Sequence, residues 1–259
     1  MCFVLLSLFL ELACVTSSRA DSLARTKVLV GSYTNKDVLA HLPRSDKKGE
    51  GIYSFSFSEK GELSLRGVTP ALNPAVLILH PNGKTLYSIT ENIDRNGSID
   101  TFDVGFEGDL LHKGSFDASG KSTCFLTVSP DETKAIVVNY WDAFIDVVHL
   151  DEKGYLKNHL QNFRHQYAPK SRQVLTREDH WENRQVGPHA HSAHFWKDRV
   201  FIPDLGENVI FQYRYSKENL FTQEAIIPLE RVSWPRHMVI HEKLGIAYVY
   251  NELKSLHMA

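Results

Sequence analysis

The chain has no large excess of charge of either sign and no run of basic residues. Among its 259 residues, 29 Lys and Arg stand against 31 Asp and Glu, which gives a net charge of −2. Electrostatics therefore gives no reason to expect a nucleic acid or a membrane surface as a partner. The one apolar run, residues 2–10, is too short to span a bilayer. Helical periodicity is also missing over any long stretch, so a helical fold is not expected.

The apolar residues 2–10 do fit the central part of a secretory signal peptide. Small residues around Ala20 lie at the spacing of a cleavage site before Asp21, although nothing basic precedes the apolar run. We therefore expect a signal peptide over residues 1–20 and one folded domain over residues 21–259. Secretion is favoured over a cytoplasmic location.

Cysteine is scarce, with three in the whole chain. Cys2 and Cys14 would leave with the signal peptide, so the remaining chain could form no internal disulfide and would depend on its hydrophobic core. Cys124 stands beside Phe125 and Leu126, which favours a buried, inert thiol over a nucleophile.

A strand–turn–strand pattern recurs along the chain. Apolar strands flank a short polar turn in residues 76–89, 126–138 and 237–249, with a degenerate copy in residues 193–202. Alternating strands that lead to a second turn lie at residues 51–57, 97–104, 143–148 and 208–213. Each repeat thus supplies four short strands, and a repeat of 40–50 residues with four strands is typical of a β-propeller blade.

The spacing of equivalent leucines gives the number of blades. Leu63, Leu110 and Leu156 are 47 and 46 positions apart, and Leu220 follows 64 positions later. The excess falls in the polar residues 158–185, which we expect to be a loop insertion. An ordinary β-sandwich does not predict so regular a repeat. The sequence therefore predicts an all-β propeller with about five blades.

The fifth repeat is short, because the chain stops within a few residues of Leu253. A propeller has to close its ring or leave unpaired strand edges exposed. We therefore expect the propeller of residues 21–259 to be incomplete at its C-terminus.

Three histidines, His189, His191 and His194, fall within six positions. In extended chain the first two point to one face and the third to the other. Such a pair suits proton transfer, anion binding or metal ligation. A zinc hydrolase is disfavoured, because Ala193 stands where its motif has an aspartate and no Cys or carboxylate lies close by. A polar loop with solvated histidines remains the alternative.

Several short motifs follow one another along the repeats. They are Gly31-Ser32-Tyr33-Thr34, Gly51-Ile52-Tyr53, Asn73-Pro74, Leu86-Tyr87, Glu91-Asn92, Asn139-Tyr140, Pro188-His189-Ala190-His191, Asp204-Leu205-Gly206, Pro235-Arg236-His237 and Asn251-Glu252-Leu253. In this order the chain resembles the seven-bladed β-propeller lactonase family, which includes propeller-type 6-phosphogluconolactonases and fungal carboxy-cis,cis-muconate cyclases. The family has seven blades, so residues that its members carry in later blades would be absent here.

The resemblance implies a hydrolase that opens a sugar lactone in the central channel and requires neither a metal nor an organic cofactor. It implies His191, Arg236 and Glu252 as the catalytic residues. Arg236 would bind the lactone carbonyl or a substrate anion, because guanidinium is permanently charged. Glu252 or His191 would be the general base or acid. The residues expected to contact the substrate are His189, Glu91 and His237.

Other interpretations stay open. A muconate-type lactonising cycloisomerase would use similar groups on a dicarboxylate in the reverse direction. A secreted propeller without catalysis could bind a ligand or a protein through its channel face, since fold does not fix function. Arg236 could be a structural partner of a blade carboxylate, and Glu252 could bind backbone donors. The expected partner is a small lactone or sugar acid, and the sequence gives no oligomeric state.

Overall fold

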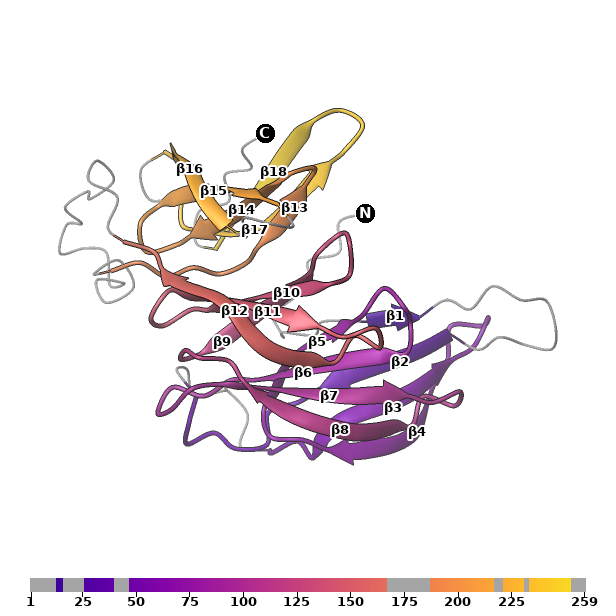
Figure 1. The fold of residues 1–259 in the computed structure, drawn as a ribbon. Helices are drawn as coiled ribbons and strands as arrows, with labels where there is room; N and C mark the ends of the chain where they lie inside the picture. Colours follow the sequence, from indigo (N-terminus) through magenta and orange to yellow (C-terminus); the bar gives the residue numbers. More distant parts are fainter. Residues whose placement is uncertain are drawn as a thin grey trace.

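The computed structural model describes residues 13–15, 26–39, 47–166, 187–216, 221–230 and 233–252. Every regular element in these ranges is a β-strand, and none of them contains a helix that could cross a membrane. The strands form four four-stranded sheets and one two-stranded sheet, which follow one another in chain order (Figure 1). The prediction of an all-β propeller with about five blades is confirmed.

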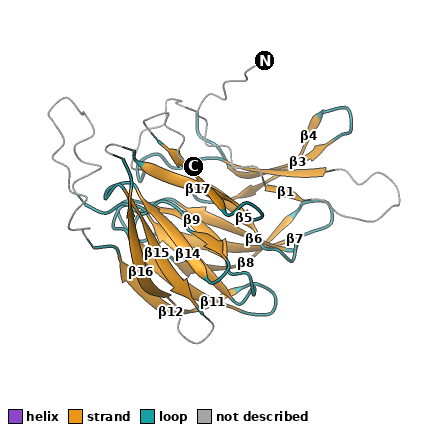
Figure 2. Ribbon diagram, turned by 90° about the horizontal axis from the view of Figure 1, so that it is seen from above, coloured by secondary structure: helices purple, strands orange, loops and turns teal. Residues whose placement is uncertain are grey.

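Each sheet is an antiparallel meander of consecutive strands (Figure 2). The first blade consists of β1 (Ala13–Val15), β2 (Thr26–Gly31), β3 (Gly51–Phe57) and β4 (Leu63–Pro70). The second consists of β5 (Pro74–Leu79), β6 (Thr85–Thr90), β7 (Ser98–Val104) and β8 (Leu110–Asp117). The third consists of β9 (Thr123–Val128), β10 (Lys134–Asn139), β11 (Phe144–Leu150) and β12 (Leu156–Arg164). The fourth consists of β13 (His194–Trp196), β14 (Arg199–Asp204), β15 (Val209–Tyr215) and β16 (Phe221–Pro228). The fifth consists of β17 (Pro235–His241) and β18 (Ile246–Asn251).

The outer strand β12 corrects one prediction. We expected residues 158–185 to be a loop insertion, but residues 158–164 complete β12 and pair with β11. Most side chains of β12 are exposed, so this strand lacks the apolar alternation by which a half-buried strand is recognised. Residues 167–185 of the expected insertion lie outside the described residues.

The short strand β1 lies within the predicted signal peptide. It pairs with β2, with Ala13 opposite Leu29 and Val15 opposite Lys27. The signal peptide over residues 1–20 stays a prediction, as does the division of the chain at residue 21.

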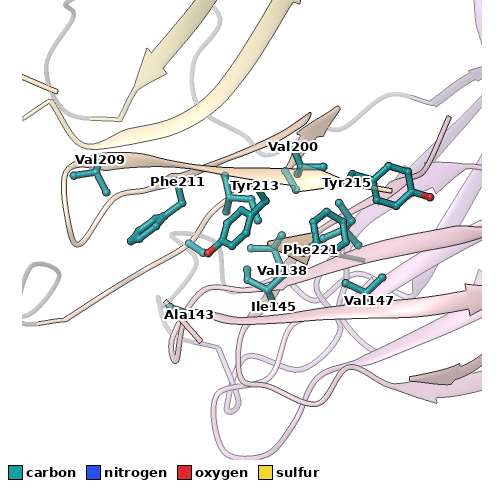
Figure 3. Packing of buried hydrophobic residues seen from close by; sticks show 14 residues of the cluster. Val138, Ala143, Ile145, Val147, Val200, Val209, Phe211, Tyr213, Tyr215 and Phe221 are labelled. Carbon is teal, nitrogen blue, oxygen red and sulfur yellow. The ribbon is translucent and has the colours of Figure 1, made fainter. Parts of the chain in front are cut away.

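Apolar side chains fill the space between neighbouring sheets. Between the third and fourth blades, Val138 and Ile145 pack in one cluster with Val200, Phe211 and Tyr213 (Figure 3). These side chains are at most 4% exposed. Burial of such a side chain contributes about 1.5–3 kcal/mol, so this contact between blades is a major source of stability.

Polar contacts at one end of the strands join neighbouring blades. The hydroxyl of Ser54 in the first blade donates to the Gly108 carbonyl at 2.9 Å, and Tyr87 in the second donates to the Gly154 carbonyl at 2.5 Å. Each accepting carbonyl belongs to the outer turn of the next blade. The loops at the other end of the strands carry the candidate site residues.

Candidate active site

Arg236 and Glu252 lie side by side because the fifth blade is an antiparallel hairpin. Arg236 is the second residue of β17 and Glu252 directly follows β18. Pro235 pairs with Asn251 in this hairpin, which brings the start of β17 to the end of β18. Arg236 Nη1 donates to Glu252 Oε2 at 2.8 Å. A blade carboxylate was one expected structural partner of Arg236. That carboxylate is Glu252, which is itself a candidate catalytic residue.

A strained backbone precedes this pair. Trp234 is 1% exposed and has a φ of 57°, in the left-handed region that bulky residues rarely adopt. Asn208 Oδ1 holds this conformation by accepting from the N–H groups of Ser233 (2.9 Å) and Trp234 (3.0 Å). The Trp234 carbonyl accepts from the Glu252 N–H at 2.9 Å. Such strain persists where the surroundings impose it and is common at functional sites.

The histidine segment is buried beside Tyr140. His189 and His191 are each 6% exposed, so the alternative of solvated loop histidines is wrong. The His189 ring stacks on Tyr140 at 4.8 Å and the His191 ring meets the same ring edge-on at 5.2 Å. His194 lies instead against Phe125 at 5.5 Å. The first two histidines thus share a neighbour that the third does not.

The tautomer of His189 follows from its partner. Its Nδ1 lies 3.0 Å from the Tyr140 carbonyl oxygen. A carbonyl only accepts, so Nδ1 is the donor, and in the neutral ring Nε2 carries the lone pair. In that form of His189, Nε2 is the ring nitrogen that can accept a hydrogen bond from a ligand.

Asp204 anchors the backbone of the histidine segment. This side chain at the end of β14 is fully buried. Its Oδ1 accepts from the N–H groups of His189 (2.8 Å) and Glu207 (2.9 Å), and its Oδ2 accepts from His165 Nδ1 at 2.7 Å. Ala190 also forms a β-bridge with Asp204. A single carboxylate thus fixes the position of the segment.

His237 joins the histidine segment to the fifth blade. Its ring lies 5.3 Å from that of His191. Burial, reinforced by the positive charge of Arg236 and opposed by Glu252, lowers the pKa of His237 to about 4. This imidazole is therefore neutral near pH 7 and can accept or donate a hydrogen bond without carrying charge. Ser192 adds a second link, because its hydroxyl donates to the Arg236 carbonyl at 2.8 Å.

Glu91 lies with Tyr33 on the side of the site formed by the first two blades. Tyr33 OH donates to Glu91 Oε2 at 2.7 Å and Ser122 Oγ donates to Glu91 Oε1 at 3.4 Å. Burial, followed by the charge and the hydrogen bond of Glu91, raises the pKa of Tyr33 well above its usual range, whereas the charge of Arg236 lowers it. The Tyr33–Glu91 pair thus lies at the same end of the strands as Arg236 and Glu252, and the charge of Arg236 acts on Tyr33.

The structure thus connects all six candidate residues at one end of the blades. His191, His237, Arg236 and Glu252 form one group with His189 beside it, and Glu91 forms a second group that the charge of Arg236 links to the first. Their catalytic and binding roles stay predictions. In the described part of the chain, no group of three or more His, Cys, Asp or Glu side chains is placed to hold a metal ion.

Sequence reasoning gave no role to five residues that hold this site. They are Tyr33, Ser122, Tyr140, Ser192 and Asp204. Three of them, Tyr33, Tyr140 and Asp204, stand in motifs that carried the family resemblance, at or just beyond strand ends. Ser122 and Ser192 give no such signal, because a single serine in a loop is common.

Arginine, carboxylate, histidine and tyrosine side chains from several blades thus lie at one end of the strands. This arrangement is that of a β-propeller with a polar site formed by the loops between its strands. The family described as "Lactonase, 7-bladed beta-propeller" matches residues 27–256. The chain belongs to this family, as the resemblance predicted.

Known proteins support the same family. The chain is 30% identical over 236 residues to a 6-phosphogluconolactonase of Formosa agariphila, covering 87% of this chain and 61% of the relative. The periplasmic gluconolactonase of Pseudomonas aeruginosa superposes with a TM-score of 0.71 at 26% identity, covering 88% of this chain and 61% of that one. A provisionally named 6-phosphogluconolactonase of Bacteroides fragilis, at 23% identity with 91% and 64% coverage, shares the fold with a TM-score of 0.72. The chain thus spans about 61% of the length of its curated relative.

Proposed function

We propose that this protein hydrolyses a sugar lactone and that Arg236, His191 and Glu252 carry the reaction. The observation that supports the proposal most strongly is the Arg236–Glu252 ion pair, with Nη1 and Oε2 at 2.8 Å, beside the buried ring of His237. The side chains of Arg236 and Glu252 are only 13% and 19% exposed, respectively. Charges in such a position interact more strongly with a substrate than charges in water do.

Lactone opening requires three tasks. The carbonyl oxygen gains negative charge when water attacks, the water loses a proton, and the ring oxygen gains one as the C–O bond breaks. Arg236 stabilises the developing oxyanion, since its guanidinium cannot lose its charge. Glu252 and His191 exchange the two protons, one with the attacking water and the other with the ring oxygen.

The remaining candidates position the substrate. His237 is neutral near pH 7 because burial lowers its pKa to about 4, so it binds a hydroxyl rather than an anion. His189 presents Nε2 from a ring that the Tyr140 carbonyl orients. Glu91 accepts hydrogen bonds from the opposite side of the site. These groups suit a polyhydroxylated ring, which supports a sugar lactone over a dicarboxylate that would be cyclised.

The test is hydrolysis of D-glucono-1,5-lactone, followed by proton release in weak buffer after subtraction of the spontaneous rate. The His191→Gln variant is expected to lose about 10²–10⁴-fold in kcat, which is the usual contribution of general acid–base catalysis. The matched control is His112→Gln, because the side chain of His112 is 51% exposed on β8, away from the site.

Full activity in His191→Gln would contradict the assigned role of His191. Absence of turnover in the wild-type chain, with this lactone and with related aldonolactones, would contradict the proposed function and favour a propeller that binds without catalysis.

A further inference from the structure

Among the described residues, one carboxylate of the site has no cation at ion-pair distance. Glu91 accepts from the hydroxyls of Tyr33 (2.7 Å) and Ser122 (3.4 Å). Within the described residues, no Lys, Arg or His lies at ion-pair distance from the Glu91 carboxylate. The cation of the site, Arg236, is engaged by the other carboxylate, Glu252.

The balance of charge follows from the groups that act on Tyr33. Burial is the largest cause that raises the pKa of this phenol; Glu91 raises it further and Arg236 lowers it, so a carboxylate and a guanidinium both act on Tyr33. With Glu252 the cluster holds two carboxylates and one guanidinium. His237 adds no charge near pH 7, because its pKa is about 4. Among these described groups, the two carboxylates outnumber the one guanidinium.

A carboxylate in this position favours ligands that donate hydrogen bonds. A carboxylate has two oxygens with about four lone-pair positions, and the two hydroxyls on Glu91 occupy two of them. Hydrogen bonds from a ligand hydroxyl to the remaining positions would be charge-assisted and therefore strong. A phosphate dianion would instead face the negative charge of Glu91, and juxtaposed like charges oppose binding.

An exposed aromatic side chain lies next to this group of residues. Trp141 is 42% exposed in the loop between β10 and β11, and its ring lies 5.7 Å from that of His189. An exposed indole offers an apolar face with a polar edge. It suits the C–H face of a sugar ring better than a charged group.

We infer that Glu91, with Tyr33 and Ser122, selects an uncharged polyhydroxy lactone against a phosphorylated one. The inference rests on the proposed function, because it concerns the substrate of that same site. Selection of the ligand can nevertheless be measured without turnover, so the two can fail separately.

The experiment compares two pairs of ligands on the full chain. The first pair is D-glucono-1,5-lactone and its 6-phosphate, compared by kcat/KM after subtraction of spontaneous hydrolysis. The second pair is 1,5-anhydro-D-glucitol and its 6-phosphate, ring analogues without a lactone bond, compared by calorimetric Kd. We expect the uncharged member of each pair to be preferred by about tenfold or more, and Glu91→Gln to reduce that preference about tenfold.

The matched control is Glu132→Gln, in the turn at the other end of the blades, where the Glu132 side chain is 49% exposed. It is expected to leave both preferences unchanged. Circular dichroism establishes that each variant is folded, and the wild-type preferences decide the inference even if Glu91→Gln does not fold.

Equal or tighter binding of the phosphorylated analogue would overturn the inference, as would binding of neither analogue or an unchanged preference in folded Glu91→Gln. If neither lactone is hydrolysed but the uncharged analogue binds more tightly, the proposed function fails and the ligand class stands. If the phosphorylated lactone is hydrolysed preferentially, the function stands and this inference fails.

Discussion

The Arg236 guanidinium donates to the Glu252 carboxylate across the β17–β18 hairpin, with Nη1 and Oε2 at 2.8 Å. The two residues are 16 positions apart in the chain, and the register that pairs Pro235 with Asn251 brings them together. Both side chains keep some exposure, 13% and 19%, so the pair can meet a ligand without leaving the hairpin. The contact that joins the two strands of the hairpin is therefore also the contact between two candidate catalytic residues, so the two residues are expected to act together.

This coupling predicts a non-additive double-mutant cycle. Arg236→Gln or Glu252→Gln alone is expected to lower kcat/KM by about 10²–10³-fold, the usual loss for one charge-stabilising group. The double variant should lose little more kcat/KM than the less active of the two single variants, because the effects of residues that act as a unit are strongly non-additive. Steady-state kinetics of the four proteins on the lactone measures the cycle.

The control cycle uses the Arg214–Glu224 pair of β15 and β16, in which the Arg214 side chain is 53% exposed. These residues are expected to show no effect on kcat/KM in either single variant. Losses that simply multiply in the Arg236/Glu252 double variant would show that the two residues act independently.

The buried histidines predict a loss of stability in acid. Burial lowers the pKa of both His194 and His237 to about 4 from 6.5. Above about pH 6.5 both rings are neutral in the folded and unfolded chains. As the pH falls toward 4, the unfolded chain binds protons that the folded chain does not, so the free energy of unfolding falls. The loss reaches about 3 kcal/mol for one ring and ends near pH 4.

Urea unfolding between pH 7 and 4.5 measures this slope. In His194→Gln the slope should become smaller, and the amide oxygen can still accept from the Met238 N–H that now donates to His194 Nε2 at 3.2 Å. The comparison cancels other titrating groups, such as Asp146, whose pKa burial raises. His112→Gln should keep the wild-type slope. An unchanged slope in His194→Gln would mean that this ring is not a source of the acid sensitivity.

Close packing against the histidine segment predicts that Gly206 cannot be enlarged without cost. A Cβ at this position would lie 1.9 Å from the Gly187 carbonyl oxygen and 2.9 Å from the His189 nitrogen. Both are backbone atoms, so the segment itself has to move. Gly206→Ala is therefore expected to lower kcat/KM by at least about tenfold, because small displacements of positioning groups are costly in catalysis.

The matched control is Gly67→Ala on β4, where an added Cβ meets nothing within 4 Å. It should leave both kcat/KM and Tm near the wild-type values. If Gly206→Ala kept full activity, the position of the 187–189 segment would not matter for the reaction.

The blades could be predicted because their signals are local and repeated. The leucines at 46–47-residue spacing mark the outer strands, and β3 has the bounds that the alternating sequence indicated. Residues 158–164 of β12 could not be predicted as a strand, since their mostly exposed polar side chains give the sequence pattern of a loop. A strand can be recognised from the sequence only where its buried side chains give it an apolar pattern.

The sequence indicated candidate residues for the site but not the contacts between them. Glu91, Tyr140 and Glu252 each directly follow the second strand of a blade, a regularity that the repeat alone would reveal. Their partners depend on the angles between blades, which no local pattern specifies. Asp204 shows this limit, because one carboxylate joins His165, His189 and Glu207 from separate parts of the chain.

The hydrogen bonds of Asp204 predict a graded effect of two substitutions at this position. In Asp204→Asn the amide oxygen can still accept from the N–H groups of His189 and Glu207. The amide nitrogen, however, would face His165 Nδ1, which now donates at 2.7 Å. To accept from this amide, Nδ1 has to give up its proton, and the neutral ring then carries a proton on Nε2, which is buried and has no hydrogen-bond partner in the described structure. An unsatisfied buried donor costs about 1–3 kcal/mol.

Asp204→Asn should therefore unfold more easily by about 1–3 kcal/mol in urea, while KM changes little because the His189 backbone remains held. Asp204→Ala loses all three hydrogen bonds, and we expect both a larger loss of stability and a fall in kcat/KM. Asp198→Asn, with a side chain 49% exposed in the β13–β14 turn, is the control and should change neither quantity. Equal kinetics in Asp204→Ala and Asp204→Asn would show that this carboxylate stabilises the fold without positioning the histidine segment.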